Sequence, residues 1–401
     1  MKPFIALVSM VAGSFALASD WPQFRGPNGA GSSDEKNLPV AFTEKDGVRW
    51  KAKLPARGVS SPIVVGNKVF VTCSSGQRDD KLHVLAFDTM SGKQLWHREF
   101  AATGITAGHP KTCMAAPTPV ADANAVYALF ATADLAALDH DGNLLWYRSL
   151  NGDYKTISNI VGMASSPVLY KDKLIVPMDN NGDSFVAAID VKTGANVWKS
   201  PRPKANNWVS PTIREITSSE VEVLFQNQKE FAAYDAETGK KKWTEKWPGG
   251  IPMTTVADGM MMVPSGGLVM YKPANGKFEE VWKSAKLRTG YSSALYYDGH
   301  VYAANPSTGV VSCVNAKTGK EAWDERVKGA KQTFSASPVA GDGKVYVLSE
   351  VGTLTVFKAG GTEADVLGTS ELKEEGLGTP AISGGAVFIR TDKHLWCIGA
   401  K

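Results

Sequence analysis

The sequence lacks the features of an integral membrane protein and of a nucleic-acid-binding protein. After the N-terminus, no segment approaches the ~18 consecutive apolar residues that indicate a membrane-spanning helix. The 44 Lys and Arg residues nearly balance the 40 Asp and Glu residues, and the formal net charge is only +4. This balance gives no strong attraction to polyanions or to anionic lipid surfaces. We therefore expect neither a membrane span nor a nucleic-acid partner.

Motifs of common catalytic and metal centres are absent too. The chain has no Cys-x-x-Cys-His haem motif and no Gly-x-Ser-x-Gly nucleophile motif. Its six histidines include no pair spaced i, i+4 on a helix, as a helical metal site would need. A metal cluster could therefore form only where the fold brings distant residues together.

Long stretches with helical periodicity are missing as well. The chain instead has 39 glycines, 11 tryptophans and short Val-rich runs separated by Gly, Asp and Asn. Short apolar runs between turn residues are typical of β-strands. The composition therefore predicts an all-β protein.

Residues 1–18 have the pattern of a signal peptide. Lys2 precedes an apolar stretch, and Ala16-Leu17-Ala18 forms a cleavage site, so we expect cutting before Ser19. The first cysteine in the chain is Cys73, so no cysteine near the cut could carry a lipid anchor. We expect an exported, soluble protein of the periplasm or cell envelope, and we expect it to be a monomer.

One segment recurs along the chain. It reads LAFDTMSGKQLW at 85–96, AAIDVKTGANVW at 187–198, AAYDAETGKKKW at 232–243 and SCVNAKTGKEAW at 312–323, with looser copies at 136–146 and 269–282. A second element, often Ser-Pro, precedes each copy and occurs eight times from Pro62 to Pro380, with a mean period of about 45 residues. A period of this length indicates a repeat architecture such as a propeller.

Each repeat predicts four short strands, with the Thr-Gly pair as a hairpin turn. The third strand is apolar on both faces, so it needs packing neighbours on both sides, as in radially stacked blades. We therefore predict an eight-bladed β-propeller of four-stranded antiparallel blades, one domain over residues 47–401. The eighth repeat ends after its third strand, and VRWKAKL at 48–54 matches the missing fourth strand. Residues 47–54 should therefore complete the last blade and close the ring.

The segment before this strand, residues 19–46, contains DWPQFRGPNG, which fits neither a helix nor an alternating strand. We interpret it as a strap along the outside of the ring, near the first and last blades. Trp21 and Phe24 would anchor it, and Arg25 would meet a carboxylate or backbone carbonyls. A partner-binding arm is the alternative interpretation.

The eleven-residue pattern Ala-x-Asp-x-x-Thr-Gly-x-x-x-Trp resembles the tryptophan-docking motif of the PQQ-type eight-bladed propellers, and WPQFRGPNG resembles the start of exported PQQ-like repeat proteins. The resemblance covers essentially the whole chain after residue 18. It implies that each tryptophan lies against a peptide of the neighbouring blade. The tryptophans at this position are Trp50, Trp96, Trp146, Trp198, Trp243, Trp282 and Trp323.

The resemblance implies two different functions, because this fold carries both enzymes and scaffolds. Quinoprotein dehydrogenases hold PQQ and Ca²⁺ in the central channel, whereas propellers resembling the outer-membrane-protein assembly lipoprotein bind proteins. This chain lacks the adjacent Cys-Cys pair and the long inter-blade insertions of the alcohol dehydrogenases, and it lacks the lipid-anchoring cysteine of the scaffold. We expect no cofactor, with PQQ and calcium as the alternative. The best metal candidates are Asp179, Asn181 and Asp183, which a solvated turn also explains.

The four cysteines can be placed on the repeat. Cys313 and Cys397 occupy the same strand position in blades six and eight, which do not touch, so we expect both to be buried thiols. Cys73 and Cys113 should lie at the same face of adjacent blades, and an oxidising compartment permits a bond between them. They are the disulfide candidate.

The face that carries the longest connections, 97–115 and 147–163, is the candidate binding surface. Residues expected near the channel mouth there are Arg57, Met114, Met163, Trp208, Tyr291 and Phe334, with Arg288 and Lys331 around them. These side chains could equally fill the channel. A rim of Met, aromatic and basic residues suits a peptide or protein partner. The sequence therefore favours a non-catalytic binding or scaffolding propeller, with a small PQQ- and calcium-dependent oxidoreductase of alcohols or sugars as the alternative, and a carbohydrate- or other ligand-binding propeller as a third reading.

Overall fold

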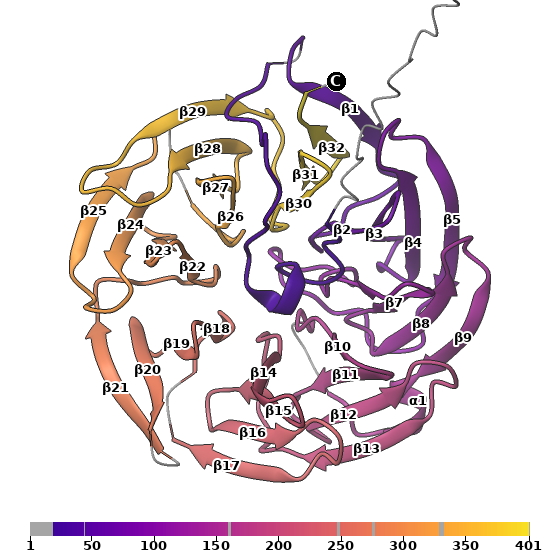
Figure 1. Cartoon of the computed structure of the whole chain (residues 1–401). Helices are drawn as coiled ribbons and strands as arrows, with labels where there is room; N and C mark the ends of the chain where they lie inside the picture. Colours follow the sequence, from indigo (N-terminus) through magenta and orange to yellow (C-terminus); the bar gives the residue numbers. More distant parts are fainter. Residues whose placement is uncertain are drawn as a thin grey trace, which may run out of the picture.

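The computed structural model describes residues 19–43, 45–158, 162–246, 249–274, 277–328 and 333–400. They form eight four-stranded antiparallel sheets arranged as blades around one axis (Figure 1). The eight-bladed propeller predicted from the repeat is confirmed. Within the described residues, no helix is long and apolar enough to cross a membrane.

Seven blades take their strands in chain order from the axis outward, and the last blade takes β1 as its outermost strand. The strands of the first four blades are β2 (Ile63–Val65), β3 (Lys68–Ser75), β4 (Lys81–Asp88) and β5 (Gln94–Ala101); β6 (Val120–Ala121), β7 (Ala125–Leu129), β8 (Asp134–Asp139) and β9 (Leu144–Ser149); β10 (Val168–Tyr170), β11 (Lys173–Met178), β12 (Phe185–Asp190) and β13 (Asn196–Pro201); and β14 (Thr212–Thr217), β15 (Glu220–Gln226), β16 (Phe231–Asp235) and β17 (Lys241–Glu245).

The strands of the last four blades are β18 (Thr255–Ala257), β19 (Met260–Pro264), β20 (Leu268–Ala274) and β21 (Lys277–Ser284); β22 (Leu295–Tyr297), β23 (His300–Ala304), β24 (Val310–Asn315) and β25 (Glu321–Arg326); β26 (Val339–Gly341), β27 (Lys344–Leu348), β28 (Thr353–Lys358) and β29 (Val366–Glu371); and β30 (Ala381–Ser383), β31 (Ala386–Arg390), β32 (His394–Ile398) and β1 (Val48–Lys53). Two short helices, η1 (Pro27–Gly29) and α1 (Leu150–Asp153), complete the described elements.

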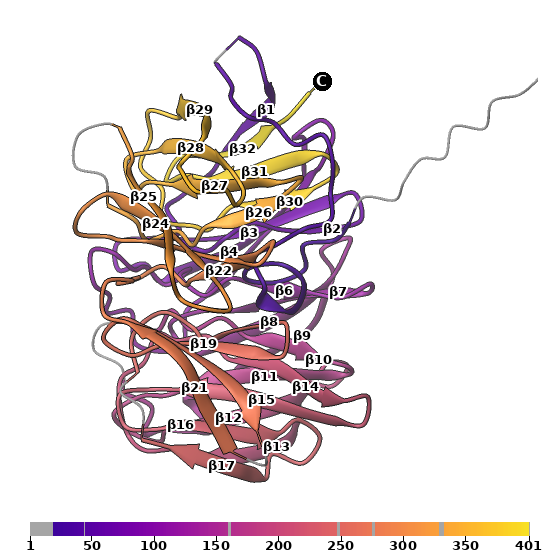
Figure 2. The ribbon, with the colours of Figure 1, turned by 60° about the vertical axis from the view of Figure 1, so that its left-hand side comes forward.

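The ring is closed by β1, which pairs antiparallel with β32 although the two strands lie at opposite ends of the chain. Figure 2 shows β1 beside β32 at the top of the molecule. Trp50 lies opposite Cys397, Lys53 lies opposite His394, and the Leu54 N–H donates to the Lys393 carbonyl at 2.8 Å. The predicted closure by an N-terminal strand is confirmed.

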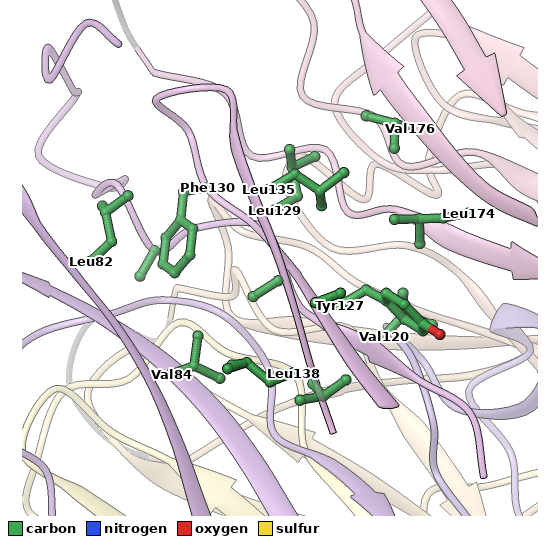
Figure 3. Packing of buried hydrophobic residues seen from close by; sticks show 14 of the residues in the cluster. Leu82, Val84, Val120, Tyr127, Leu129, Phe130, Leu135, Leu138, Leu174 and Val176 are labelled. Carbon is green, nitrogen blue, oxygen red and sulfur yellow. The ribbon is translucent and has the colours of Figure 1, made fainter. Parts of the chain in front are cut away.

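The hydrophobic core runs between blades because the inner strands are buried on both faces. In β7 all five residues are buried. Figure 3 shows Tyr127 and Val120 of the second blade packed among residues of its two neighbours, with Leu82 and Val84 on one side and Leu174 and Val176 on the other. The apolar third strands noted in the sequence therefore meet neighbours on both sides, as radial stacking requires.

Six of the repeat tryptophans donate their indole N–H to a backbone carbonyl of the following blade. The acceptors are Thr89 for Trp50, His140 for Trp96, Val191 for Trp146, Ala236 for Trp198, Ala316 for Trp282 and Gly360 for Trp323. The indole lies against the turn of that blade: a Cβ added at Gly239 would come within 2.5 Å of the Trp198 ring. Trp243 differs, since its N–H points to Glu222 in its own blade, 3.3 Å away.

Glu374 connects the closing strand to the last blade. Its carboxylate accepts from Lys51 of β1 at 2.8 Å, from Thr391 at 2.7 Å and from His394 of β32 at 3.0 Å. Burial of the carboxylate opposes ionisation, but these hydrogen bonds prevail and lower the pKa of Glu374 to about 2.

We expect this contact to make stability depend on acid. A carboxyl whose pKa is depressed by folding stabilises the protein above its unfolded pKa of ~4.3, and loses that contribution as the pH falls through the folded value. Glu374→Gln should therefore lower the melting temperature near neutral pH and flatten its decline between about pH 4.5 and pH 2. Thermal melts across this range measure the effect. If the melting temperature of the variant fell with pH as steeply as that of the unsubstituted protein, the prediction would be wrong.

The strap does not follow the outside of the ring. Trp21 exchanges backbone hydrogen bonds with Val64 of β2 at 2.7 and 2.9 Å, and Ser33 donates to Ala340 of β26 at 2.9 Å, so the segment touches the innermost strands of the two blades that flank the last blade. Between these points η1 lies at the centre of the ring (Figure 1). Trp21 and Arg25 are fully buried, and Arg25 donates to Thr255 and to the Ala30 and Ala294 carbonyls, so its expected contact with backbone carbonyls is confirmed. The predicted path was wrong because these contacts join residues far apart in sequence.

Candidate functional site

The two faces of the ring differ in what covers the channel. We call the face with the fourth-to-first and second-to-third strand connections the loop face, and the opposite face the turn face. The strap lies on the turn face: Asp20 accepts from Gly66, and Glu35 accepts from Gly384 and Gly385, all at first hairpin turns of blades. The channel can therefore be approached by a partner chiefly from the loop face.

A cavity of about 360 Å³ lies in the loop-face end of the channel. One residue of each blade lines it, two positions before the Ser-Pro element or its equivalent. This upper ring consists of Val59, Ala116, Ala164, Trp208, Ile251, Tyr291, Ser335 and Leu377. The ring is mostly apolar, and it has two large aromatic side chains. Trp208 is partly buried and donates its indole N–H to Gly162 at 3.1 Å, whereas Tyr291 is 44% exposed.

The long connection between β5 and β6 reaches over this cavity. Its Lys111 forms an ion pair with Glu350 of the seventh blade at 2.8 Å and lies 4.9 Å from the centre of the Tyr291 ring. Ser335 donates to the same Glu350 carboxylate at 2.6 Å. Burial opposes ionisation of Glu350, yet the hydrogen bonds from Lys111 and Ser335 lower its pKa below the usual value. The mouth is thus an apolar recess beneath a neutralised ion pair.

Three residues expected at the mouth lie elsewhere. Met114, Met163 and Phe334 are buried within the core clusters between blades. Side chains of an extended chain alternate between two sides. Met163 and Phe334 stand three positions before Ser166 and Ser337 of their Ser-Pro elements, an odd offset that turns them away from the channel. Trp208 and Tyr291 have the even offset and line the cavity.

The basic residues of the predicted rim differ in their surroundings. Arg57 pairs with Asp392 at 3.2 Å and donates to the Pro110 and Thr112 carbonyls, so it supports the long connection. It also lines a second cavity, of about 730 Å³, beside the mouth. Arg288 is exposed. Lys331 lies outside the described residues.

The metal candidates are already engaged with protein groups. Asp179 is buried and paired with Arg202 at 2.8 Å, and Asp183 pairs with Lys199 at 2.9 Å. The Asn181 N–H donates to the Ser158 carbonyl. Both carboxylates therefore have a cationic partner within the protein.

The lining of the channel mouth does not fit PQQ with calcium. Calcium needs several oxygen ligands, usually including carboxylates. In the described part of the upper ring and its cover, the carboxylate present is Glu350, which Lys111 and Ser335 already occupy. The quinone would meet Val, Ala, Ile and Leu side chains together with Trp208 and Tyr291, so what the described residues lack is a set of calcium ligands: they contain no group of three or more His, Cys, Asp or Glu side chains placed to hold a metal ion.

The predicted disulfide is not formed. All four cysteines are free and buried. The Cys73 sulfur accepts a hydrogen bond from Arg390 of the last blade at 3.4 Å. Burial raises the pKa of the Cys73 and Cys113 thiols, and their proximity adds to the rise at Cys73.

We expect the native protein to be inert toward a thiol reagent and the unfolded protein to react at four cysteines without prior reduction. Buried thiols of raised pKa supply almost no thiolate, the reactive form. Titration with a chromogenic disulfide in buffer and then in denaturant counts them. If only two thiols reacted after unfolding, the other two cysteines would be bonded, and the Cys73–Cys113 disulfide would be present.

Comparison with known proteins agrees with the fold. A family model described as "Outer membrane protein assembly factor BamB" matches residues 31–201 and 182–401. The chain is 26% identical over 250 residues to a polyvinylalcohol dehydrogenase of Sphingopyxis sp. (strain 113P3), a match that covers 52% of this chain and 36% of that protein. The chain thus spans about a third of the length of this curated relative.

Two solved structures share the architecture. The quinohemoprotein alcohol dehydrogenase from Comamonas testosteroni superposes with a TM-score of 0.72 at 14% identity, over 96% of this chain and 81% of that one. BamB from Moraxella catarrhalis gives 0.62 at 14% identity, over 88% and 99%. At this identity the likeness concerns the fold alone.

Proposed function

We propose a function on the premise that this chain belongs to the family described as outer membrane protein assembly factor BamB. The proposed function is non-catalytic: the propeller binds an extended segment of a partner protein at its loop face and serves as a scaffold in the periplasm or cell envelope. The signal-peptide pattern of residues 1–18, which lie outside the described residues, supports export.

The observation that carries the proposal is the apolar recess at the channel mouth. Large aromatic side chains in a water-excluding recess are typical anchors of protein interfaces. Trp208 and Tyr291 supply two such side chains, and the surrounding residues supply few groups for chemistry. Lys111 stays partly exposed beside Glu350, and Arg288 is exposed in the connection between β21 and β22. Both side chains can interact with backbone carbonyls or acidic side chains of a bound segment.

The alternative is a quinone-dependent oxidoreductase, favoured by the likeness to a protein named polyvinylalcohol dehydrogenase. Against it stands the lack of a group of three or more His, Cys, Asp or Glu side chains that could hold calcium among the described residues. We therefore rank it second.

Binding to an array of short unstructured peptides tests the proposal. We expect a subset with apolar side chains to bind, and Trp208→Ala and Tyr291→Ala each to weaken that binding about tenfold or more, the loss typical of an interface anchor. Tyr296→Ala is the matched control, because Tyr296 lies in the same blade but near the turn face, where its hydroxyl contacts Asp258. Equal binding by all variants, or no peptide above background, would contradict the proposal.

A further inference from the structure

A nearly closed ring of hydroxyl groups surrounds the channel two residues below the upper ring. We call it the hydroxyl belt; its members are Ser61, Thr118, Ser166, Ser210, Ser293, Ser337 and Thr379. Each accepts a hydrogen bond of 2.9–3.1 Å from a backbone N–H of the preceding blade. The last of these runs from Thr379 to Ser61, between the eighth blade and the first.

The belt has one gap, at the fifth blade. Met253 takes the position that a hydroxyl has in the other blades, and it donates its N–H to Ser293 at 3.1 Å. The strap packs against this methionine: a Cβ added at Gly29 would lie 3.2 Å from the Met253 methyl. Phe24 of the strap belongs to the same cluster and lines the channel from below.

The belt hydroxyls have a hydrogen left to donate. All seven residues are at most 6% exposed. A hydroxyl has one O–H donor besides its acceptor lone pairs, and buried donors are normally paired. Each of the seven hydroxyl oxygens accepts an N–H bond. Within the described residues, none of the seven O–H groups donates to a protein acceptor. The belt is thus a circle of buried donors around a hollow centre.

The hollow centre is continuous with the mouth. A space of about 130 Å³ is lined by six of the seven belt residues, by Met253 and Phe24, and by the eight residues of the upper ring. The channel therefore contains one compartment with two kinds of wall. Its upper part is apolar and aromatic, and its lower part offers hydroxyl donors.

A buried cation lies just below the belt. Arg25 is fully buried, and its guanidinium donates to Thr255 at 2.7 Å and to the Ala294 carbonyl at 2.8 Å, next to belt positions 253 and 293. Its Nε has no partner in the described structure. None of the ion pairs found among the described residues involves Arg25, so its charge is left without a neighbouring carboxylate. Uncompensated burial lowers the pKa of Arg25 to about 9. Such a site favours an anion nearby over a second cation.

We propose that the channel compartment binds a small amphipathic molecule, with an oxygen-acceptor head, preferably a carboxylate, at the hydroxyl belt and an apolar body between Trp208 and Tyr291. The volumes of the upper cavity (about 360 Å³) and of the lower space (about 130 Å³) together fall within the range of volumes typical of small-ligand sites. This site shares Trp208 and Tyr291 with the proposed partner-binding surface and differs from it in its polar determinants, which lie beneath the mouth.

Three probes with the same eight-carbon chain test the head group: octanoate, 1-octanol and octylamine. Calorimetric titration should give one octanoate per chain, weaker binding of 1-octanol, and binding of octylamine at least about tenfold weaker than octanoate. Octylamine binding as tightly as octanoate would overturn the proposal, as would the absence of binding by all three, which would mean that water alone solvates the belt.

Two substitutions locate the site. Ala164→Phe fills the upper part without touching a belt hydrogen bond, and should abolish octanoate binding while the melting temperature stays close to that of the unsubstituted protein. Thr118→Val removes one hydroxyl at nearly constant shape and should weaken octanoate more than 1-octanol. Unchanged octanoate binding by Ala164→Phe would place the ligand outside the channel.

Peptide binding at the mouth is measured separately with Tyr291→Ala, so each proposal can fail alone.

Discussion

Deletion of residues 47–54 should abolish cooperative folding of the whole propeller. The deletion removes β1, so β32 loses its outer partner and the last blade keeps three strands. It also removes Trp50, whose indole donates to Thr89 of the first blade at 2.9 Å, and therefore opens the junction between the ends of the chain. Exposed edges of this kind promote aggregation.

Chemical unfolding followed by circular dichroism, with light scattering for aggregation, measures the outcome. Supplying residues 47–54 as a separate peptide is the control, since a strand added in trans should recover part of the cooperative transition. A soluble monomer of nearly unchanged melting temperature after the deletion would show that the ring does not depend on this strand.

The second large effect is expected at the tryptophans between blades. Trp198→Ala should lower the free energy of unfolding by roughly 3–5 kcal/mol, the range for large aromatic truncations in cores. Trp198 is buried, its N–H donates to Ala236 of the next blade at 3.1 Å, and its ring fills the space above Gly239. No neighbouring side chain can fill that space, because the contact is made by backbone.

Trp208→Ala is the matched comparison. Trp208 lines the channel mouth and makes one hydrogen bond to Gly162, so its removal enlarges an existing cavity instead of creating one in the core. The expected loss of stability is much smaller, while peptide binding should fall. Parallel denaturant melts of the two variants measure the difference. Equal losses of unfolding free energy would show that Trp208 contributes to stability as a core residue does.

The repeat predicted the fold because every blade encodes the same local information. An apolar third strand, a Thr-Gly turn and a tryptophan recur at fixed spacing, and packing between equal units follows from that pattern. The closing strand was predictable for the same reason, since Trp50 aligns with Trp96. Trp243 shows the limit: it fits the pattern, yet its N–H meets Glu222 within its own blade.

The site was predicted only in part. Trp208 and Tyr291 line the mouth as expected, whereas Met163 and Phe334 have the odd offset that turns a side chain into the core. Met114 is buried although its offset from Thr118 is even, so the offset alone does not decide which side chains reach the channel. The Lys111–Glu350 pair joins residues 239 positions apart, through a loop whose path no local pattern determines. The course of the strap across the channel was unpredictable for the same physical reason, since Arg25 finds its partners 230 and 269 positions away.

Titration of the purified protein with PQQ in the presence of Ca²⁺, followed by absorbance and then by dye reduction with an alcohol, tests the central claim most directly. Because Glu350 at the mouth is paired with Lys111, and because the described residues contain no group of three or more side chains that could hold calcium, we predict no saturable calcium-dependent uptake of PQQ and no alcohol-dependent dye reduction. Stoichiometric uptake of PQQ with turnover of the alcohol would contradict a non-catalytic scaffold and make this propeller an oxidoreductase.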